Sequence, residues 1–320
     1  MKKILIISGD PNSINSEIIF KSFIKLKKNL RKKIIFISNY NLIKDQFKKL
    51  KYNLNINKIN NLNEKIDTNK LNIFDVKLKF KKPFNVTKNE RSKFILKSLD
   101  LGHNFALRKN IIGLINCPID KELLKKEKIG VTEFLANKCR VRNSSEVMLL
   151  FNNKLAVCPI TTHIDIKEVD NKLSKTKIVK KVETINNWYK KKFKKSAKIL
   201  VLGLNPHNAE LRKNSREVNT IIPAIKVLKK KSLIIHGPFP SDTAFINEYK
   251  KFDVIIGMYH DQVIGPYKSI FKFNAINVTL GLKYLRASPD HGTAVNLVGK
   301  NKANYESLIS CIKLVDKFGK

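Results

Sequence analysis

Short apolar runs that alternate with longer amphipathic segments are the feature that most limits what this chain can fold into. Polar residues, Gly or Pro bound each run, and the segments between the runs space their apolar residues three and four apart. This alternation predicts strand and helix units around a parallel sheet, and therefore an α/β fold. The expected strands are Ile4–Ile7, Ile34–Ile37, Ile111–Ile115, Leu155–Ile160, Ile199–Leu204, Leu233–Ile235, Val254–Gly257 and Ala275–Leu280. The expected helices are Ser16–Leu30, Asn89–Leu101, Ile178–Phe193 and Val218–Leu228, and irregular or edge structure is expected over residues 41–85.

The net charge of the chain is +38, from 64 Lys plus Arg against 26 Asp plus Glu among 320 residues. Apolar residues make up 42% of the chain, which excludes disorder of the whole protein. A basic nucleic-acid-binding protein is one interpretation, because Lys and Arg neutralise phosphates. However, 56 of the basic residues are Lys spread along the whole chain, and only 8 are Arg, whose planar fork suits phosphate best. We therefore interpret the charge mainly as solvated surface and expect no nucleic-acid partner.

The sequence contains no apolar run of the ~18 residues that a membrane span requires, and no secretory signal is expected. Four cysteines stand alone, without a C-x-x-C pair or a spacing typical of a disulfide framework. We expect no membrane partner, a cytoplasmic location and buried, reduced thiols.

Three of the expected strands are followed by a histidine, which indicates chemistry at one edge of the sheet. These are His163, His207 and His260. Ligands of open parallel sheets lie beyond the carboxyl ends of the strands, so the three imidazoles are expected to converge. Three imidazoles with open coordination positions suit one catalytic divalent metal ion, such as zinc, magnesium or cobalt. A structural role for each histidine, as a partner of a neighbouring carbonyl, is the alternative.

Two carboxylates stand near these histidines in the sequence. Asp261 directly follows His260, and Asp242 lies within the segment from Gly237 to Thr243. Either can orient a metal ligand or accept a proton, whereas the alternative role for Asp242 is that of a helix N-cap. Asp242 and Asp261 are therefore the candidate catalytic residues.

Several motifs, in order and spacing, resemble those of the 4-hydroxythreonine-4-phosphate dehydrogenase family from Gly9 to about Gly299. They are Thr161-Thr162-His163, Gly203-Leu204-Asn205-Pro206-His207, Gly237-Pro238-Phe239-Pro240-Ser241-Asp242-Thr243, Met258-Tyr259-His260-Asp261-Gln262 and Asp290-His291-Gly292-Thr293-Ala294. The resemblance implies two α/β/α domains with parallel or mixed sheets, akin to isocitrate and isopropylmalate dehydrogenases, with the active site in the interdomain cleft. It assigns residues 1–130 plus about 281–320 to the first domain. It assigns about residues 131–280, which include the metal-binding histidines, to the second domain.

The resemblance further implies a reaction in pyridoxal 5'-phosphate (vitamin B6) biosynthesis. This is the NAD-dependent, divalent-metal-dependent oxidation of 4-phosphooxy-L-threonine to 2-amino-3-oxo-4-phosphooxybutanoate, followed by decarboxylation to 3-amino-2-oxopropyl phosphate. The implied partners are the small phosphorylated substrate and a second copy of the chain, in a homodimer with the site near the subunit interface.

Individual site residues carry over from the family by position. The family's divalent-metal ligands fall on His163, His207 and His260. Its substrate-binding positions fall on Thr132, Lys268, Asn277 and Arg286, and its cofactor-binding segment falls on His291, Gly292, Thr293 and Ala294. No G-x-G-x-x-G motif follows the first strand, which agrees with a non-Rossmann NAD site.

The chain departs from the family pattern in four places. Val131 stands where the family has a substrate-contacting His, and Asn296 stands where an acidic residue is common. The first loop, Gly9–Ser16, lacks two glycines, and Asn208–Ser215 replaces a glycine-rich stretch. These loops would change shape unless an asparagine adopts the left-handed conformation, the candidates being Asn12, Asn15, Asn208 and Asn214. Because these differences alter the substrate pocket, the alternative interpretation is a family paralogue that oxidises a related phosphorylated four-carbon hydroxy acid.

Overall fold

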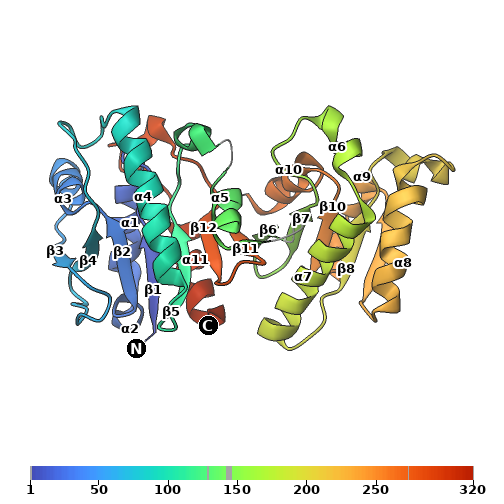
Figure 1. Cartoon of the computed structure of the whole chain (residues 1–320), viewed down its shortest axis with the longest axis horizontal. Helices are drawn as coiled ribbons and strands as arrows, with labels where there is room; N and C mark the ends of the chain where they lie inside the picture. The colour runs from blue at the N-terminus through green and yellow to red at the C-terminus, as the bar shows by residue number, and fades with distance from the viewer. Residues whose placement is uncertain (1, 128–129, 142–145, 273, 320) are drawn as a thin grey trace. The chain divides into compact units, whose positions relative to one another are not determined.

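A computed structural model describes residues 2–127, 130–141, 146–272 and 274–319, and it shows an α/β protein (Figure 1). The chain divides into two compact units. The first contains residues 1–139 and 282–320, and the second contains residues 140–281. Each unit has its own strands and helices, so each is described by itself.

The first unit contains a parallel sheet with the strand order β3-β4-β2-β1-β5-β12. Its strands are β1 (Lys3–Ile7), β2 (Ile34–Ser38), β3 (Ile56–Ile59), β4 (Leu71–Asp75), β5 (Ile111–Asn116) and β12 (Arg286–Pro289). Its helices are α1 (Asn15–Lys25), α2 (Lys28–Arg31), α3 (Tyr40–Lys49), α4 (Lys88–Ala106), η1 (Lys121–Glu127), α5 (Val131–Lys138), η5 (Val295–Leu297) and α11 (Glu306–Phe318). Helix α4 packs on β1, β2 and β5, whereas α11 packs on β1, β5 and β12. The apolar runs β1 and β2 are buried throughout, as the central strands of a parallel sheet require.

The second unit contains a mixed sheet with the strand order β11-β6-β7-β10-β8-β9. Its strands are β6 (Val147–Phe151), β7 (Ala156–Pro159), β8 (Ile199–Leu202), β9 (Ile235–Phe239), β10 (Val254–Gly257) and β11 (Ile276–Leu280). Its helices are α6 (Ile166–Lys172), α7 (Lys175–Phe193), η2 (Pro206–Leu211), η3 (Glu217–Ile221), α8 (Ile222–Lys230), α9 (Ser241–Ala244), η4 (Glu248–Lys251) and α10 (His260–Phe271). Strand β6 runs antiparallel to β7 and β11, whereas β7, β10, β8 and β9 run parallel. Apolar side chains from these strands and from α10, including the fully buried Tyr267, form the core.

The fold class expected from the sequence is confirmed, and most of the expected strands and helices are present. The expected helix Ser16–Leu30 is interrupted, because Leu26 and Lys27 adopt extended backbone between α1 and α2. The expected strand Leu233–Ile235 is misplaced, since β9 begins at Ile235 and continues to Phe239. Four strands were not anticipated, namely β3, β4, β6 and β12.

The stretch from 41 to 85 is partly an edge, as expected, because β3 is the outermost strand of its sheet. It is not irregular throughout, since it also contains most of α3 and all of β4. The side chain of Asn39 caps α3 by accepting a hydrogen bond from the backbone N–H of Leu42 at 2.8 Å. A capping asparagine of this kind is a start signal for a helix. The start of α3 was not predicted from the sequence, because asparagine is frequent in this chain and Asn39 alone did not mark a helix.

The first unit extends beyond the limit of about residue 130 expected from the resemblance. Helix α5 (Val131–Lys138) packs against α4 and η1 and therefore groups with the first unit. Thr132, on α5, also accepts a hydrogen bond from Arg286 of that unit.

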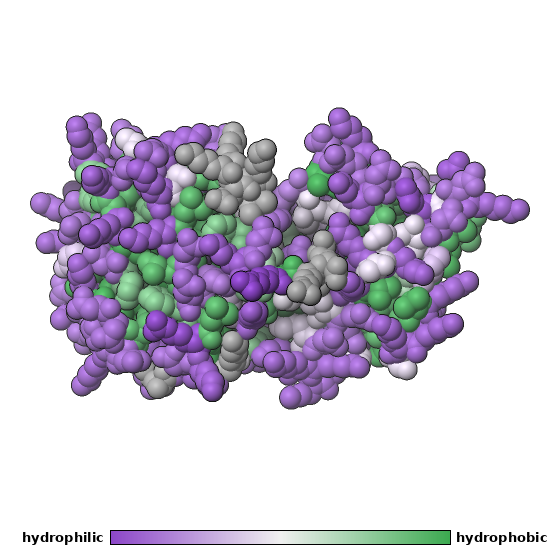
Figure 2. All heavy atoms as spheres, in the orientation of Figure 1, coloured by the Kyte–Doolittle hydropathy of each residue, from purple (hydrophilic) through white to green (hydrophobic). Residues whose placement is uncertain are grey.

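Hydrophilic side chains cover most of the face seen in Figure 2, with hydrophobic residues between them. The four cysteines are free and buried, as their isolated positions predicted. None of the helices in the described ranges is long and apolar enough to cross a membrane.

Candidate active site

Three neighbouring parallel strands of the second unit lead to the three histidines. Strand β10 lies between β7 and β8, and all three run in the same direction. His163 follows β7, His260 follows β10 and His207 follows β8. Because parallel strands place their carboxyl ends at the same edge, these residues start from one edge of one sheet. This arrangement is the one that the strand-end pattern predicted.

Side-chain hydrogen bonds tie the ends of these three strands together. Thr161 Oγ1 donates to the carbonyl of Met258 at 2.7 Å, which joins the end of β7 to the end of β10. Gln262 Oε1 accepts from the N–H of Met258, and Gln262 Nε2 donates to the carbonyl of Gly203 beyond β8, both at 2.7 Å. Gln262 is buried, so these bonds are shielded from water. The backbone that presents the histidines is therefore fixed before any ligand binds.

His163 and His260 lie close together, with ring centroids 6.0 Å apart. A metal–imidazole bond is about 2.0–2.1 Å long, so two rings that share an ion have centroids within about 6.5 Å of each other. Asp261 Oδ1 lies 2.7 Å from His260 Nδ1, which leaves Nε2 of His260 as the nitrogen for a metal. A carboxylate behind a ligating imidazole is a common device for orienting the ring. This pair therefore fits a divalent metal ion.

His207 does not join this pair within one chain. Across residues 2–127, 130–141, 146–272 and 274–319, no three His, Cys, Asp or Glu side chains are close enough to hold a metal ion. The structure thus brings together two of the three expected ligands.

The backbone around His207 is left-handed over five consecutive residues. The φ angles of residues 207–211 lie between 46° and 57°. Left-handed backbone costs about 1–2 kcal/mol per non-Gly residue, so this segment persists only because its surroundings hold it. Asn208, one of the asparagines expected to become left-handed, has a φ of 57° and donates from Nδ2 to the carbonyl of Pro238 at 3.2 Å. The loop thus keeps a left-handed shape without glycine.

Glu217 holds the start of this segment. It is fully buried, and its Oε1 accepts hydrogen bonds from the N–H groups of Leu204 and Asn205, each at 2.8 Å. Its Oε2 accepts from Asn205 Nδ2 at 3.1 Å. Burial raises the pKa of Glu217, but these hydrogen bonds outweigh it, so the pKa lies below its ordinary value. Glu217 therefore remains an anion that anchors the loop leading to His207.

The first unit holds a second group of predicted residues around Arg286. Arg286 is buried at the start of β12, and its Nε donates to Asn116 Oδ1 at 2.8 Å. Its Nη1 donates to Thr132 Oγ1 at 3.2 Å, so two of the predicted substrate-binding residues are in contact. Burial lowers the pKa of Arg286 to about 10, although the neighbouring Cys311, Tyr284 and Glu133 act to raise it. A buried guanidinium with fixed orientation is well suited to an anionic group.

The remaining predicted residues of the second unit are dispersed over three elements. Asp242 is exposed in the first turn of α9, where Pro240 and not Asp242 is the N-cap. Lys268 is half-buried on α10, the helix that starts with His260. Asn277 lies on β11, and its Oδ1 is buried with no hydrogen-bond partner among the described residues. A ligand donor at this point would satisfy that oxygen.

The segment predicted to bind the dinucleotide lies between β12 and η5 in the first unit. The carbonyl of Thr293 accepts from the N–H of Ile14 at 3.2 Å, which attaches the segment to the start of α1. The N–H of Asp290 donates to Ser307 Oγ at 3.1 Å. Gly292 is exposed, and a Cβ built on it would meet no atom within 4 Å. The backbone at Gly292 is therefore open to solvent and accessible.

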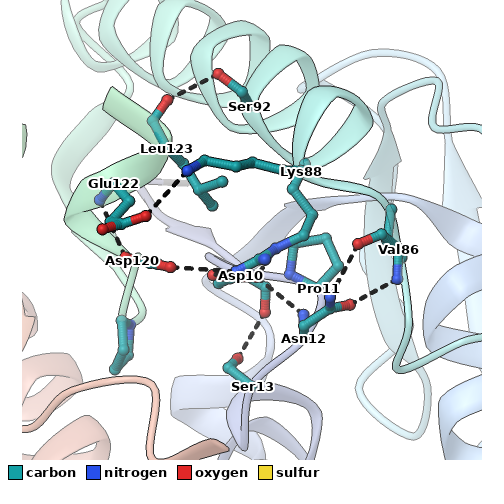
Figure 3. Close-up of polar contacts among 12 residues, drawn as sticks. Asp10, Pro11, Asn12, Ser13, Val86, Lys88, Ser92, Asp120, Glu122 and Leu123 are labelled. Atoms are coloured by element: carbon teal, nitrogen blue, oxygen red, sulfur yellow. Dashed lines mark hydrogen bonds and ion pairs between the residues drawn. The ribbon is translucent and has the colours of Figure 1, made fainter. Parts of the chain in front are cut away.

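The first strand-end loop is held by side-chain hydrogen bonds that replace the missing glycines (Figure 3). Asp10 Oδ1 accepts from the N–H of Asn12 at 2.9 Å, and Ser13 Oγ donates to the carbonyl of Asp10 at 2.6 Å. Asn12 and Val86 exchange two hydrogen bonds, each of 2.9 Å. Gly9 keeps a φ of 74°, and a Cβ there would lie 2.4 Å from the carbonyl oxygen of Pro118. The loop thus needs Gly9 but not the other two glycines.

Sequence reasoning missed three residues that build the site. Asn116 stands directly after the apolar run of β5, so the strand-end rule that selected the histidines applied to it as well. Glu217 is a rare acid at the start of a helix in a basic chain. Arg91 Nε donates to the buried Asp10 at 2.8 Å, which fixes the first loop, and Arg91 is one of only 8 arginines.

Known proteins resemble this chain over almost its full length. The family model for "Pyridoxal phosphate biosynthetic protein PdxA" matches residues 30–315. A 4-hydroxythreonine-4-phosphate dehydrogenase of Sulfurihydrogenibium sp. (strain YO3AOP1) is 37% identical over 322 residues, which cover 98% of this chain and 97% of that relative. Another, of Aquifex aeolicus (strain VF5), is 41% identical over 215 residues, 66% of each chain. The crystal structure of 4-hydroxythreonine-4-phosphate dehydrogenase from Klebsiella pneumoniae superposes with a TM-score of 0.85 at 25% identity, covering 99% of both chains.

The fold, the strand-end histidines and the buried arginine together define an α/β oxidoreductase, a dehydrogenase. More specifically, the chain belongs to the family of the pyridoxal phosphate biosynthetic protein PdxA.

Proposed function

We propose that this protein oxidises 4-phosphooxy-L-threonine to 2-amino-3-oxo-4-phosphooxybutanoate with NAD and a divalent metal ion. Loss of carbon dioxide from that product then gives 3-amino-2-oxopropyl phosphate, a step toward pyridoxal 5'-phosphate. The main support is the placement of His163, His260 and His207 after three adjacent parallel strands in a chain of this family.

The proposed metal ligands are His163, His207 and His260. Zinc, magnesium or cobalt at this position would polarise the substrate hydroxyl and later the ketone. Asp261, through its contact with His260 Nδ1, holds that imidazole in the tautomer with Nε2 available as a ligand. In the proposed homodimer the site lies near the subunit interface. A second copy of the chain is the natural source of the remaining imidazole, because one chain brings only two together.

The proposed substrate contacts come from Arg286, Thr132, Lys268 and Asn277. Arg286 supplies a fixed positive charge for a phosphate or carboxylate, and Thr132 holds one edge of the guanidinium in place. Asn277 Oδ1, which is buried without a hydrogen-bond partner among the described residues, would accept a hydrogen bond from the substrate. Since Asp261 already binds His260, Asp242 is the better candidate for accepting the proton of the substrate hydroxyl.

The proposed cofactor segment is His291, Gly292, Thr293 and Ala294. Open space beside Gly292 and attachment of Thr293 to the start of α1 suit a bound dinucleotide. We also propose a cytoplasmic location, because four free thiols persist best in a reducing compartment.

The test is NADH formation by the full chain with 4-phosphooxy-L-threonine, NAD and a divalent ion. We expect turnover that a chelator abolishes and that added ion restores. Carbon dioxide release should accompany NADH formation in equal amount. No NADH from authentic substrate with zinc, magnesium or cobalt would refute this assignment.

A family paralogue with a related phosphorylated four-carbon hydroxy acid as its substrate is the second candidate. Val131, at the start of α5 beside Thr132, favours it. An apolar side chain in place of the family's His provides no hydrogen bond to a substrate amino or phosphate group. Comparing kcat/KM for 4-phosphooxy-L-threonine and for its analogue without the amino group decides between the two. Restoring the imidazole with Val131→His should raise kcat/KM for the amino acid if the first assignment holds.

A further inference from the structure

A polar pocket in the second unit contains none of the residues proposed above as metal, substrate or cofactor contacts. Its volume is about 500 Å³, which lies within the range typical of small-molecule sites. Three of its lining residues carry positive charge, namely Arg212, Lys213 and Arg216, and one, Asp170, carries negative charge. Side-chain amides of asparagines complete the polar lining.

Arginine is the unusual element of this lining. The chain has only 8 arginines among 64 basic residues, yet two of them, Arg212 and Arg216, line this one pocket. Lysines are so frequent here that Lys213 alone would mean little. Arg212 and Lys213 also lie within Asn208–Ser215, the stretch that replaces the family's glycines. Two of the three cationic residues of the pocket therefore lie in the stretch where this chain departs from the family pattern.

The two arginines have different roles. Arg216 pairs with Asp170 through two parallel hydrogen bonds, from Nε to Oδ1 at 2.7 Å and from Nη2 to Oδ2 at 2.6 Å. The hydrogen bond from Arg216 lowers the pKa of Asp170, so this pair is neutral as a unit. Arg212 uses Nε to donate to the carbonyl of Ala209 at 3.3 Å, and it has no acidic partner among the ion pairs of the described residues. Arg212 and Lys213 therefore give the pocket its excess positive charge.

The pocket is built on a firm framework. Ser215 is buried, and its Oγ accepts from the N–H of Val218 at 3.3 Å, while its carbonyl accepts from the N–H of Asn219. Asn219 Nδ2 in turn donates to the carbonyl of Lys213 at 2.9 Å. These bonds fix the backbone that carries the cationic side chains, which reduces the entropy cost of binding.

We propose that this pocket binds a small phosphate-bearing anion. A guanidinium and an ammonium on one rigid loop match a phosphate dianion, and the amides around them suit the hydroxyl groups of a phosphorylated metabolite. The pocket includes Asn205, two residues before His207, so the anion would contact the same loop that carries the proposed metal ligand. The proposal extends beyond the proposed dehydrogenase reaction and does not depend on it.

Titration calorimetry of the full chain with inorganic phosphate tests this proposal, at about pH 8 where phosphate is a dianion. We expect saturable binding with a Kd of about 1 mM in ~150 mM NaCl, a salt concentration that screens the general surface charge. Arg212→Gln and Lys213→Gln should each weaken binding about fivefold, as the loss of one charge-assisted hydrogen bond predicts. Lys229→Gln on α8, an exposed lysine outside the pocket, is the matched control and should leave binding within about twofold.

Equal weakening by all three variants would show general surface attraction and overturn the proposal. Heat that does not saturate by ~50 mM phosphate would do the same. Loss of binding in Arg286→Met but not in Arg212→Gln would assign the phosphate to the Arg286 group instead. If Arg212→Gln fails to fold because Ala209 loses its donor, Lys213→Gln decides the question alone.

Discussion

Arg286 in the first unit and Glu217 in the second are both buried charges, yet the protein treats them differently. Burial opposes the charged form in each case. For Glu217, hydrogen bonds from Leu204 and Asn205 outweigh burial, and the carboxylate stays ionised. For Arg286 burial has the larger effect, and the pKa falls to about 10.

In the proposed function, this difference separates a structural charge, that of Glu217, from a ligand-binding charge, that of Arg286. The charge of Glu217 is compensated within its own loop, so it stabilises the fold. The guanidinium of Arg286 is held in place by hydrogen bonds to the neutral side chains of Asn116 and Thr132, and in the proposed function it also binds the substrate anion. In the proposed metal site, His163 and His260, whose ring centroids lie 6.0 Å apart, would likewise bind a ligand, namely the metal ion.

The largest effect is expected for substitutions of the three proposed metal ligands. His260→Ala should weaken binding of cobalt or zinc by about 10³-fold, since one of three imidazoles carries several kcal/mol of the binding free energy. His163→Ala and His207→Ala should act alike. The matched control is His236→Ala, because His236 is exposed on β9 and only stacks edge-on against Phe252 at 5.4 Å. Cobalt absorption spectra measure the binding, and an unchanged affinity in His260→Ala would remove that residue from the site.

The second-largest effect is expected for Arg286, and it directly tests the comparison between Arg286 and Glu217. Arg286→Met should lower kcat/KM of the proposed reaction by about 10²-fold, the value of a charge-assisted contact to substrate. The free energy of unfolding should change by less than about 1 kcal/mol, because the lost buried charge was itself costly. Urea denaturation measures the stability. Arg108→Met, whose guanidinium is exposed over the ring of Phe105, is the control and should leave activity unchanged.

A large loss of stability in Arg286→Met, with activity reduced in proportion, would contradict the distinction drawn above. Arg286 would then be a structural charge like Glu217, and the substrate anion would need another partner.

The third effect distinguishes the roles of the two candidate catalytic carboxylates, Asp242 and Asp261. Asp261→Asn should weaken metal binding about tenfold, because His260 loses the carboxylate that orients it. Asp242→Asn should leave metal affinity unchanged but reduce turnover if Asp242 accepts the proton. Metal titration and steady-state rates, measured on both variants, distinguish these roles. Reduced metal affinity in Asp242→Asn would assign that carboxylate to the metal site.

The sequence predicted the strand ends well because buried parallel strands make continuous apolar runs with abrupt polar ends. The runs that lead to His163, His207 and His260 are found as β7, β8 and β10. The order in which these strands pair, with β10 in the middle, is not visible in the sequence, because pairing depends on contacts between residues far apart in the chain. The separation of His207 from the other two histidines was unpredictable for the same reason.

Strands without a strong apolar run were harder to predict. Strand β3 contains two adjacent polar residues, Asn57 and Lys58, at a sheet edge, and β12 contains Arg286 and Ser288. Arg286 lies within a buried strand, where a charged residue is unexpected unless it serves a site.

The local backbone conformation was also partly predictable from the sequence. The expectation for Asn208 is confirmed, while Asn15 became the first residue of α1 and hydrogen-bonds to Pro118.

The smallest effect concerns the pH dependence of stability. The pKa of Glu217 in the folded protein lies below the ordinary value of 4.5, so the unfolded chain binds a proton first as the pH falls. Its contribution is therefore complete above pH 4.5 and is lost as the pH drops through the folded pKa. Glu217→Gln should cost about 1 kcal/mol at pH 7, the difference between charged and neutral hydrogen bonds.

Urea unfolding of the wild type and of Glu217→Gln, measured from pH 7 down to pH 3.5, should show two curves that converge as the pH falls. Glu210→Gln provides the control, because Glu210 is exposed in the same segment and should leave the curve unchanged. Parallel curves for the wild type and Glu217→Gln would mean that the charge of Glu217 does not anchor the His207 loop. The contrast with Arg286 would then rest on burial alone and not on how each charge is compensated.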